Sequence, residues 1–153
     1  MKKILYLHGL DGSLSQDKRN ILETHFEIVS PQLDYRNTPD CFHFLSKLIK
    51  SEQVDAVIGN SMGGCFAYYL SIHNSLPALC FNPALEGLTI DISLNLPPLK
   101  KDFASIIFVI GGRDDVVIAE KNFQWICQQN LNPNFILKWY NEMPHVVYMD
   151  VFA

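Results

Sequence analysis

The sequence is poor in charge and contains no long hydrophobic run. Charged residues make up 18% of its 153 residues, and 12 basic residues against 16 acidic ones give a net charge of −4. Because a negative chain repels phosphate groups, we expect neither nucleic acid nor an anionic membrane surface as a partner. No run approaches the roughly 18 apolar residues of a membrane-spanning helix. The apolar fraction of 48% is enough for the core of one domain over residues 1–153.

The cysteines lack the spacing of a metal site or a disulfide framework. They stand at Cys41, Cys65, Cys80 and Cys127, without a C-x-x-C pair. Cys41 and His43 come nearest to a ligand cluster, but no further ligand follows at zinc spacing, so we expect no metal and no cofactor. Free thiols favour a reducing cytoplasm. The apolar start of the chain ends at His8, too early for a signal peptide, which also predicts a cytoplasmic location.

Short apolar runs alternate with helical patterns along the chain. The apolar runs predict strands at 4–7, 27–30, 54–58, 78–81, 106–110 and 135–139. The helical patterns predict helices from Ser13 or Ser15 to about Thr24, and over 38–50, 62–73 and 119–130. For the second helix, Thr38 is the predicted N-cap and Pro39 the first helical residue. Strands that alternate with helices indicate an α/β fold, with a parallel sheet covered on both faces.

One segment breaks this alternation. Apolar residues recur there at every second position, namely Leu88, Ile90, Ile92, Leu94 and Leu96. This period is typical of an extended chain with one apolar face. The simplest interpretation is a half-buried loop packed on the body of the domain. Two further hypotheses are a flap that lines a substrate pocket and an edge that pairs with a second subunit, so an oligomer remains open.

The motif with the most chemical content is Gly59-Asn60-Ser61-Met62-Gly63, which matches G-x-S-x-G. A nucleophile elbow requires this motif on a sharp turn between a strand and a helix, so that the serine hydroxyl stands above the sheet. A predicted strand precedes the motif here and a predicted helix follows it. The alternative is a glycine-rich turn whose serine only caps the helix.

A serine hydroxyl is a weak nucleophile, so it needs a base, and the base needs an orienting acid. In folds with an elbow the expected order along the chain is Ser, Asp, His. Asp114 and Asp115 directly follow the strand at 106–110, and either can be the acid. His145 follows the last strand and is the only histidine beyond residue 73. It is therefore the candidate base, against the alternative of a purely structural histidine.

Acyl transfer also needs two donors for the oxyanion of the tetrahedral intermediate. The backbone N–H of Met62, at the start of a helix, is the first candidate. The loop after the first strand predicts the second candidate, the N–H of Leu10. Within that loop His8 is expected to brace the backbone by hydrogen bonds, and we assign it no chemical step.

These positions together resemble the α/β-hydrolase superfamily over nearly the whole chain. Three stretches are more narrowly similar to the small YqiA-type bacterial esterases: Leu5 to Gly9, Ser61 to Gly64 leading to Tyr68–Ser71, and Leu76 to Ala78 leading to Phe81–Ala84. The sequence departs from that resemblance twice. Asn60 stands where many superfamily members have His, and the region between Pro83 and Ile106 is shorter than expected.

The resemblance implies a three-layer fold without a cap domain and six strands in the order 2-1-3-4-5-6. It implies Ser61 as nucleophile, His145 as base and Asp114 as acid, with Leu10 and Met62 as oxyanion donors. The function expected is a carboxylesterase for small or short-chain acyl esters. The alternatives are a thioesterase with the same triad and a non-catalytic interaction module with the same fold. A Rossmann nucleotide binder fits less well, since no G-x-G-x-x-G follows the first strand.

The position of His145 near the end of the chain leads to a further expectation. Only the residues after Pro83 are left to cover the site, and they are too few for a helical cap domain. We therefore expect an open, shallow site with modest selectivity.

Overall fold

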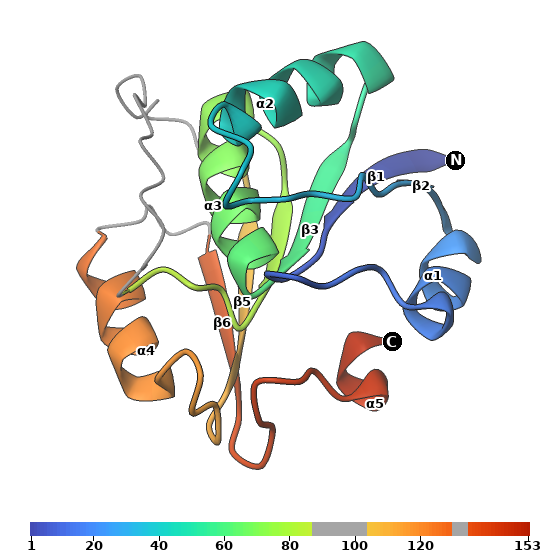
Figure 1. Ribbon diagram of the computed structural model, residues 1–153. Coiled ribbons are helices and arrows are strands. Elements are labelled where there is room, and N and C mark those ends of the chain that lie inside the picture. Colours follow the sequence, from blue (N-terminus) through green and yellow to red (C-terminus); the bar gives the residue numbers. More distant parts are fainter. Residues whose placement is uncertain (87–103, 130–134) are drawn as a thin grey trace.

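A single parallel sheet organises the chain in the computed structural model, which describes residues 1–86, 104–129 and 135–153 (Figure 1). All neighbouring strands pair in parallel, in the order β2-β1-β3-β4-β5-β6. The strands are β1 Lys2–Leu7, β2 Phe26–Val29, β3 Ala56–Asn60, β4 Ala78–Phe81, β5 Ile106–Gly111 and β6 Phe135–Tyr140. The predicted α/β class and strand order are thus confirmed.

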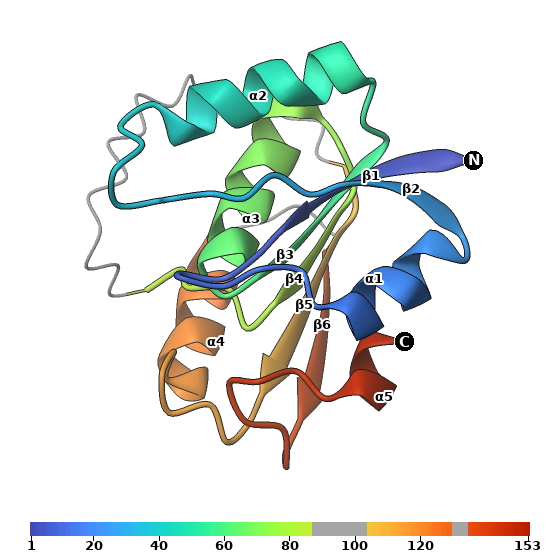
Figure 2. The ribbon, with the colours of Figure 1, turned by 45° about the vertical axis from the view of Figure 1, so that its right-hand side comes forward.

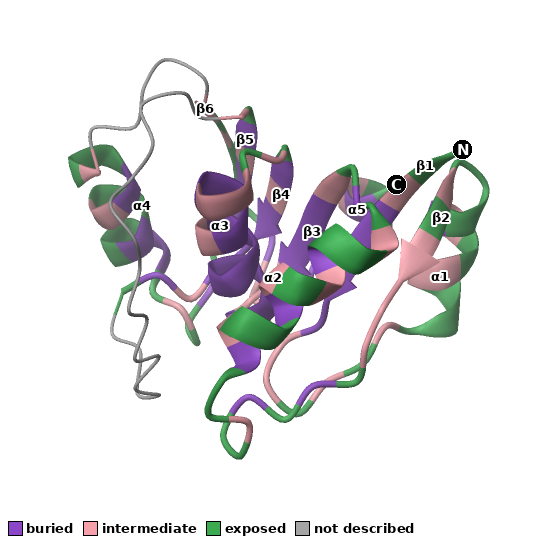
Figure 3. Cartoon of the chain, turned by 90° about the horizontal axis from the view of Figure 1, so that it is seen from above, coloured by how far each residue is buried: buried purple, intermediate pink, exposed green. Residues whose placement is uncertain are grey.

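Helices cover both faces of the sheet. They are α1 Gln16–Glu23, α2 Cys41–Glu52, α3 Met62–Asn74, α4 Ala119–Gln128 and α5 Met149–Phe152. Helices α2, α3 and α4 cover one face, and α1 and α5 lie beside each other on the opposite face (Figures 2 and 3). The result is the expected three-layer arrangement. The predicted extended segment at 88–96 lies outside the described residues.

The inner strands contain nearly continuous apolar runs because both of their faces are buried. Along β1, Leu5 and Leu7 join the core under α2, α3 and α4, whereas Ile4 and Tyr6 join the core under α1 and α5. The remaining inner strands alternate in the same way. Successive side chains of a strand point to opposite faces of its sheet, so a strand between two helix layers needs apolar residues at every position.

The start of α2 differs from the sequence prediction. The helix begins at Cys41 rather than at Pro39. The N–H of Thr38 donates to the carbonyl of Asp34 (3.0 Å), and the N–H of Cys41 donates to the carbonyl of Thr38 (3.2 Å). Residues 34–40 therefore form turns of their own before the helix, and Thr38 does not cap it. Asp40 takes the N-cap position instead, without a side-chain capping bond.

Two smaller differences concern β3 and α5. β3 begins at Ala56 rather than at Val54, because the N–H of Val54 donates to the carbonyl of Ile49 (3.0 Å) and so closes the end of α2. α5 was not predicted from the sequence. It has only 4 residues, too few to show a helical period.

The described residues were compared with the requirements of a membrane span and of a metal site. In residues 1–86, 104–129 and 135–153, no helix is long and apolar enough to cross a membrane. Within the same ranges no three His, Cys, Asp or Glu side chains gather as a metal site would require. Cys41 faces the core while His43 is exposed, so the two side chains do not converge. All four cysteines are free thiols, and of these only Cys127 is exposed.

Candidate active site

Ser61 occupies the sharp turn between β3 and α3. Its backbone has φ 54° and ψ −114°, a region that L-residues rarely adopt and that stores strain. The turn is held by its neighbours: the Ser61 N–H donates to Phe81 O (2.9 Å), and the N–H of Ala84 donates to Ser61 O (3.0 Å). The hydroxyl makes no capping bond to α3. Ser61 therefore has the geometry of a nucleophile elbow rather than of an N-cap serine.

The elbow needs glycine at two positions because backbone segments approach there too closely for a side chain. A Cβ at Gly59 would collide with the backbone of Gly63. A Cβ at Gly63 would collide with the carbonyl groups of Leu7 and His8 at the end of β1. The two glycines of the motif thus let the start of α3 lie directly against β1 and β3.

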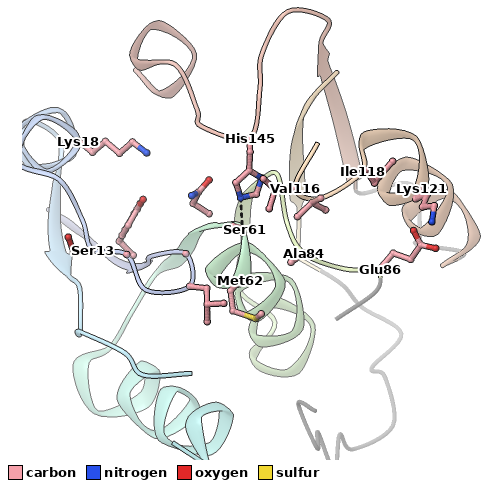
Figure 4. A pocket seen from close by; sticks show the side chains of 16 residues that line it. Ser13, Lys18, Ser61, Met62, Ala84, Glu86, Val116, Ile118, Lys121 and His145 are labelled. Carbon is pink, nitrogen blue, oxygen red and sulfur yellow. Dashed lines mark hydrogen bonds between the residues drawn. The ribbon is translucent and has the colours of Figure 1, made fainter. Parts of the chain in front are cut away.

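Ser61 and His145 lie 84 residues apart in the sequence and meet at the carboxyl edge of the sheet. His145 Nε2 lies 3.0 Å from Ser61 Oγ, the interaction dashed in Figure 4. On the other side of the ring, Nδ1 lies 2.7 Å from Asp114 Oδ2. A carboxylate only accepts hydrogen bonds, so Nδ1 carries the proton and donates it to Asp114. Nε2 is then free to accept the hydrogen bond of the Ser61 hydroxyl.

The structure distinguishes the two candidate acids. Asp114 is buried, with 6% of its surface exposed, and its second oxygen accepts the N–H groups of Val116 (3.0 Å) and Val117 (2.8 Å). These bonds satisfy the oxygen that does not face His145 and fix the carboxylate in place. Asp115 is exposed. Of the two, Asp114 alone contacts the imidazole.

Asn82 connects the loop of His145 to the sheet, and no motif in the sequence marked it. Its side chain is fully buried; the amide nitrogen donates to Pro144 O (3.1 Å) and His145 O (2.9 Å). Its amide oxygen accepts the N–H of Gly111 (2.7 Å), at the end of β5. The available signal was a polar residue at the carboxyl end of an apolar strand, directly before Pro83. One buried amide thus joins β4, β5 and the histidine loop.

His8 braces the loop after β1, in the role expected for it. Its ring accepts the N–H of Leu33 at Nε2 (2.9 Å), so its proton sits on Nδ1 and is donated to Gly9 O (2.7 Å). The hydroxyl of Tyr35 donates to the carbonyl of His8 (2.7 Å). Both ring nitrogens are therefore used within the scaffold, and the side chain is buried.

A cavity of about 710 Å³ opens beside Ser61 and His145. Leu10 and Met62, whose N–H groups are the predicted oxyanion donors, both line it. Met62 is the first residue of α3, where an N–H has no helical acceptor. The cavity lies where the chain leaves β1 and β3, which is the switch point of strand order where ligands bind in open α/β sheets.

Residues 116–118 line the same cavity, and no motif in the sequence marked them. Val116 and Ile118 are exposed at its rim (Figure 4). They follow the loop of Asp114, so the N–H groups that hold the carboxylate and the apolar side chains of the cavity come from one segment. The proposed flap residues at 88–96 lie outside the described chain, and their role stays a prediction.

Comparison with known proteins assigns the chain to a sequence family. A sequence model described as uncharacterised protein family UPF0227 matches residues 3–90, more than half of the chain. The chain belongs to the UPF0227 family. The matched part of this UPF0227 chain contains the elbow and the loop after β1, and the resemblance to a small α/β-hydrolase that the sequence suggested is confirmed.

Solved structures of low sequence identity share the fold. Acyl-protein thioesterase 2 of Zea mays is 17% identical, with a TM-score of 0.67 over 97% of the UPF0227 chain and 88% of its own. A Bacillus cereus carboxylesterase is 17% identical, with a TM-score of 0.67 over 99% and 84%. A predicted CIB-like hydrolase of Thermoplasma acidophilum is 18% identical, with a TM-score of 0.68 over 99% and 80%. These matches show the α/β-hydrolase fold.

Proposed function

We propose that this UPF0227 protein is a serine hydrolase that cleaves carboxylic esters of small or short-chain acyl groups. The observation that carries the proposal is the continuous series of hydrogen bonds from Asp114 through His145 to Ser61. It ends at a hydroxyl on a strained elbow beside a cavity. Activating a serine requires a base within hydrogen-bond distance and an acid that orients that base, and these contacts meet both conditions.

The reaction begins when Ser61 Oγ attacks the ester carbonyl carbon while its proton passes to His145 Nε2. The oxyanion that forms accepts hydrogen bonds from the N–H groups of Leu10 and Met62. Asp114 stabilises the imidazolium ion and holds its tautomer. When the intermediate collapses, the C–O bond to the alcohol breaks, and Nε2–H gives its proton to the leaving oxygen.

An acyl-enzyme on Ser61 remains after the alcohol leaves. His145 then takes a proton from a water molecule, whose oxygen attacks the acyl carbon. The second tetrahedral intermediate releases the carboxylic acid, and the proton returns to Ser61 Oγ. Thioester hydrolysis follows the same path with a thiol as leaving group. The fold shared with both a thioesterase and a carboxylesterase supports testing both bonds.

The proposal is tested by covalent labelling and by a panel of substrates. A fluorophosphonate probe is expected to label the native protein at one residue, which peptide mapping identifies as Ser61. Nitrophenyl acetate, butyrate, hexanoate and octanoate then define the acyl length, and matched ester and thioester pairs define the bond. If the probe does not react with Ser61 and no ester or thioester is hydrolysed, the chain is a non-catalytic module.

The role of Asn82 in positioning the loop of His145 can be tested by substitution. Asn82→Asp keeps an acceptor for the N–H of Gly111, but it sets a carboxylate against the carbonyls of Pro144 and His145 in place of the amide donor. We expect this repulsion to displace the loop of His145 and to lower kcat by up to about 10²-fold, because small shifts of reacting groups slow the reaction strongly. KM should change little, since Asn82 does not line the cavity.

Asn74→Asp is the matched control for this variant. The Asn74 amide also donates to a backbone carbonyl, that of Leu70 (2.9 Å), but at the far end of α3. A comparable loss of kcat in both variants would show that Asn82 acts only through general stability. Melting temperatures of both variants accompany the kinetics.

A further inference from the structure

Lys18 lines the cavity of Ser61 and His145, although its helix supplies none of the reacting groups. Figure 4 shows its side chain reaching toward these two residues from the side of α1. Ser15 caps the helix, and its hydroxyl accepts the N–H of Lys18 (3.5 Å), which fixes Lys18 in the first turn. The side chain is half-buried. The scaffold thus holds a positive charge at the substrate cavity.

Within the described part of the chain, no carboxylate pairs with this ammonium group. Asp17, which directly precedes Lys18, is exposed and forms no ion pair with it, while Asp11 pairs with Arg36 and Glu23 pairs with Arg19. The Lys18 ammonium instead lies 5.0 Å from the centre of the Phe152 ring. Burial lowers the pKa of Lys18, as expected for a charge that has lost water without gaining an anion. An anionic ligand would compensate that loss.

Tyr6 adds a second donor near Lys18, because the Tyr6 ring and the Lys18 ammonium both contact Phe152. It lines the cavity with only 2% of its surface exposed, and none of the described residues accepts a hydrogen bond from its hydroxyl. Burial raises the pKa of Tyr6 to about 12, so the hydroxyl keeps its proton at neutral pH. An ammonium group and a phenol O–H are both donors, which suit an acceptor with several oxygens.

The side of the cavity opposite Lys18 has mainly apolar side chains next to Ser61. Ala84, Val116 and Ile118 lie there, and Glu86 and Lys121 are exposed farther out (Figure 4). This side suits an apolar group. The cavity therefore has a donor-rich side with Lys18 and Tyr6 and an opposite side that is apolar near Ser61, with Glu86 and Lys121 only at its outer edge.

We propose that this chain acts on esters that carry an anionic group, a carboxylate or a phosphate, which Lys18 binds beside the scissile bond. The proposal rests on the proposed hydrolase function and names its substrate class. Lys18 is then a specificity-determining residue that contacts the substrate and takes no part in proton transfer. The anion belongs either to the acyl group or to the leaving alcohol, and the experiment distinguishes the two.

Two pairs of substrates of nearly equal shape test the preference. Methyl hydrogen succinate against methyl pentanoate places the charge in the acyl group. 4-Acetoxybenzoate against 4-tolyl acetate places it in the leaving group. In one pair the wild-type protein is expected to have the higher kcat/KM for the anion, and this preference should weaken as salt screens the charge. Equal values within both pairs would overturn the proposal.

Lys18→Met removes the charge but keeps an unbranched side chain that can pack on Phe152. We expect the ratio of kcat/KM for anionic over neutral substrate to fall by about 10- to 100-fold, the range for hydrogen bonds to charged groups. Lys18→Arg should retain most of the preference and Lys18→Glu should reverse it. Lys47→Met is the matched control, because Lys47 is exposed on α2 and outside the cavity.

A readout without turnover separates this proposal from the hydrolase function. Succinate and 4-hydroxybenzoate, the anions that match the two substrate pairs, are both tested, and at least one should raise the melting temperature of the wild-type protein and not that of Lys18→Met. If neutral esters are hydrolysed through Ser61 but neither the ratio nor the melting shift depends on Lys18, this inference alone is wrong. If the shift depends on Lys18 but no ester is cleaved, the hydrolase proposal alone is wrong.

Discussion

Ser61→Ala is expected to lower kcat/KM for a short-chain ester by on the order of 10⁴-fold or more. The variant has no atom that can attack the carbonyl carbon, so no acyl-enzyme forms. His145 Nε2 also loses the hydroxyl that lies 3.0 Å away. The cavity and the N–H groups of Leu10 and Met62 remain, which leaves only the residual rate that binding and the oxyanion site support. Steady-state kinetics with nitrophenyl butyrate measure the loss.

The fold should tolerate this substitution, because the Ser61 hydroxyl does not cap α3 and alanine keeps the Cβ. Circular dichroism and the melting temperature check that expectation. Ser51→Ala is the matched control, since Ser51 is exposed on α2 and its hydroxyl donates only to the carbonyl of Leu48. Wild-type turnover by Ser61→Ala would contradict the proposed nucleophile, and fluorophosphonate labelling that persists at another residue would identify the alternative.

Asp114→Asn is expected to lower kcat by on the order of 10⁴-fold while the protein remains folded. Asparagine can still accept the N–H groups of Val116 and Val117 at its oxygen. Its NH₂ group then faces His145 Nδ1, which must become the acceptor. The ring proton moves to Nε2 and points at Ser61, so the histidine cannot take the serine proton.

Asp115→Asn is the control that the sequence itself offers. It removes the same charge one residue away, but Asp115 is exposed and does not contact the imidazole. We expect its kcat to stay within about twofold of the wild type, as for most surface substitutions. If Asp115→Asn were the more damaging change, the assignment of the acid would be wrong. Nitrogen chemical shifts of the His145 ring report the tautomer independently of the rate.

Most strands could be predicted from composition and period alone. β4 was predicted with its observed bounds of Ala78–Phe81, because a strand buried on both faces is apolar throughout and stops at polar residues or proline. The start of α2 was predicted too early. Thr38 and Pro39 have the residue types of a helix start, but the N–H of Thr38 donates to the carbonyl of Asp34 and places Thr38 in a separate turn. Competition between local turns is not visible in residue types.

The elbow was predictable because the motif and its context are local in sequence. Gly59 and Gly63 allow the close approach of backbones, and Ser61 stands between a strand and a helix. The residues alone offered two candidates for the acid, and only the resemblance favoured Asp114. Asp114 and Asp115 are chemically identical neighbours, and what distinguishes them is the direction of the side chain, which the Val116 and Val117 N–H groups impose.

Residue types and their spacing were enough to predict the α/β class, the place of the elbow and the order in which Ser61 and His145 follow the strands. The folded chain was needed to show which carboxylate meets His145, that Asn82 holds the histidine loop, and that Lys18 faces the same cavity as Ser61. These contacts join segments up to 63 residues apart, or aim one side chain rather than its neighbour. Such directions are set by packing and by the hydrogen bonds of other elements.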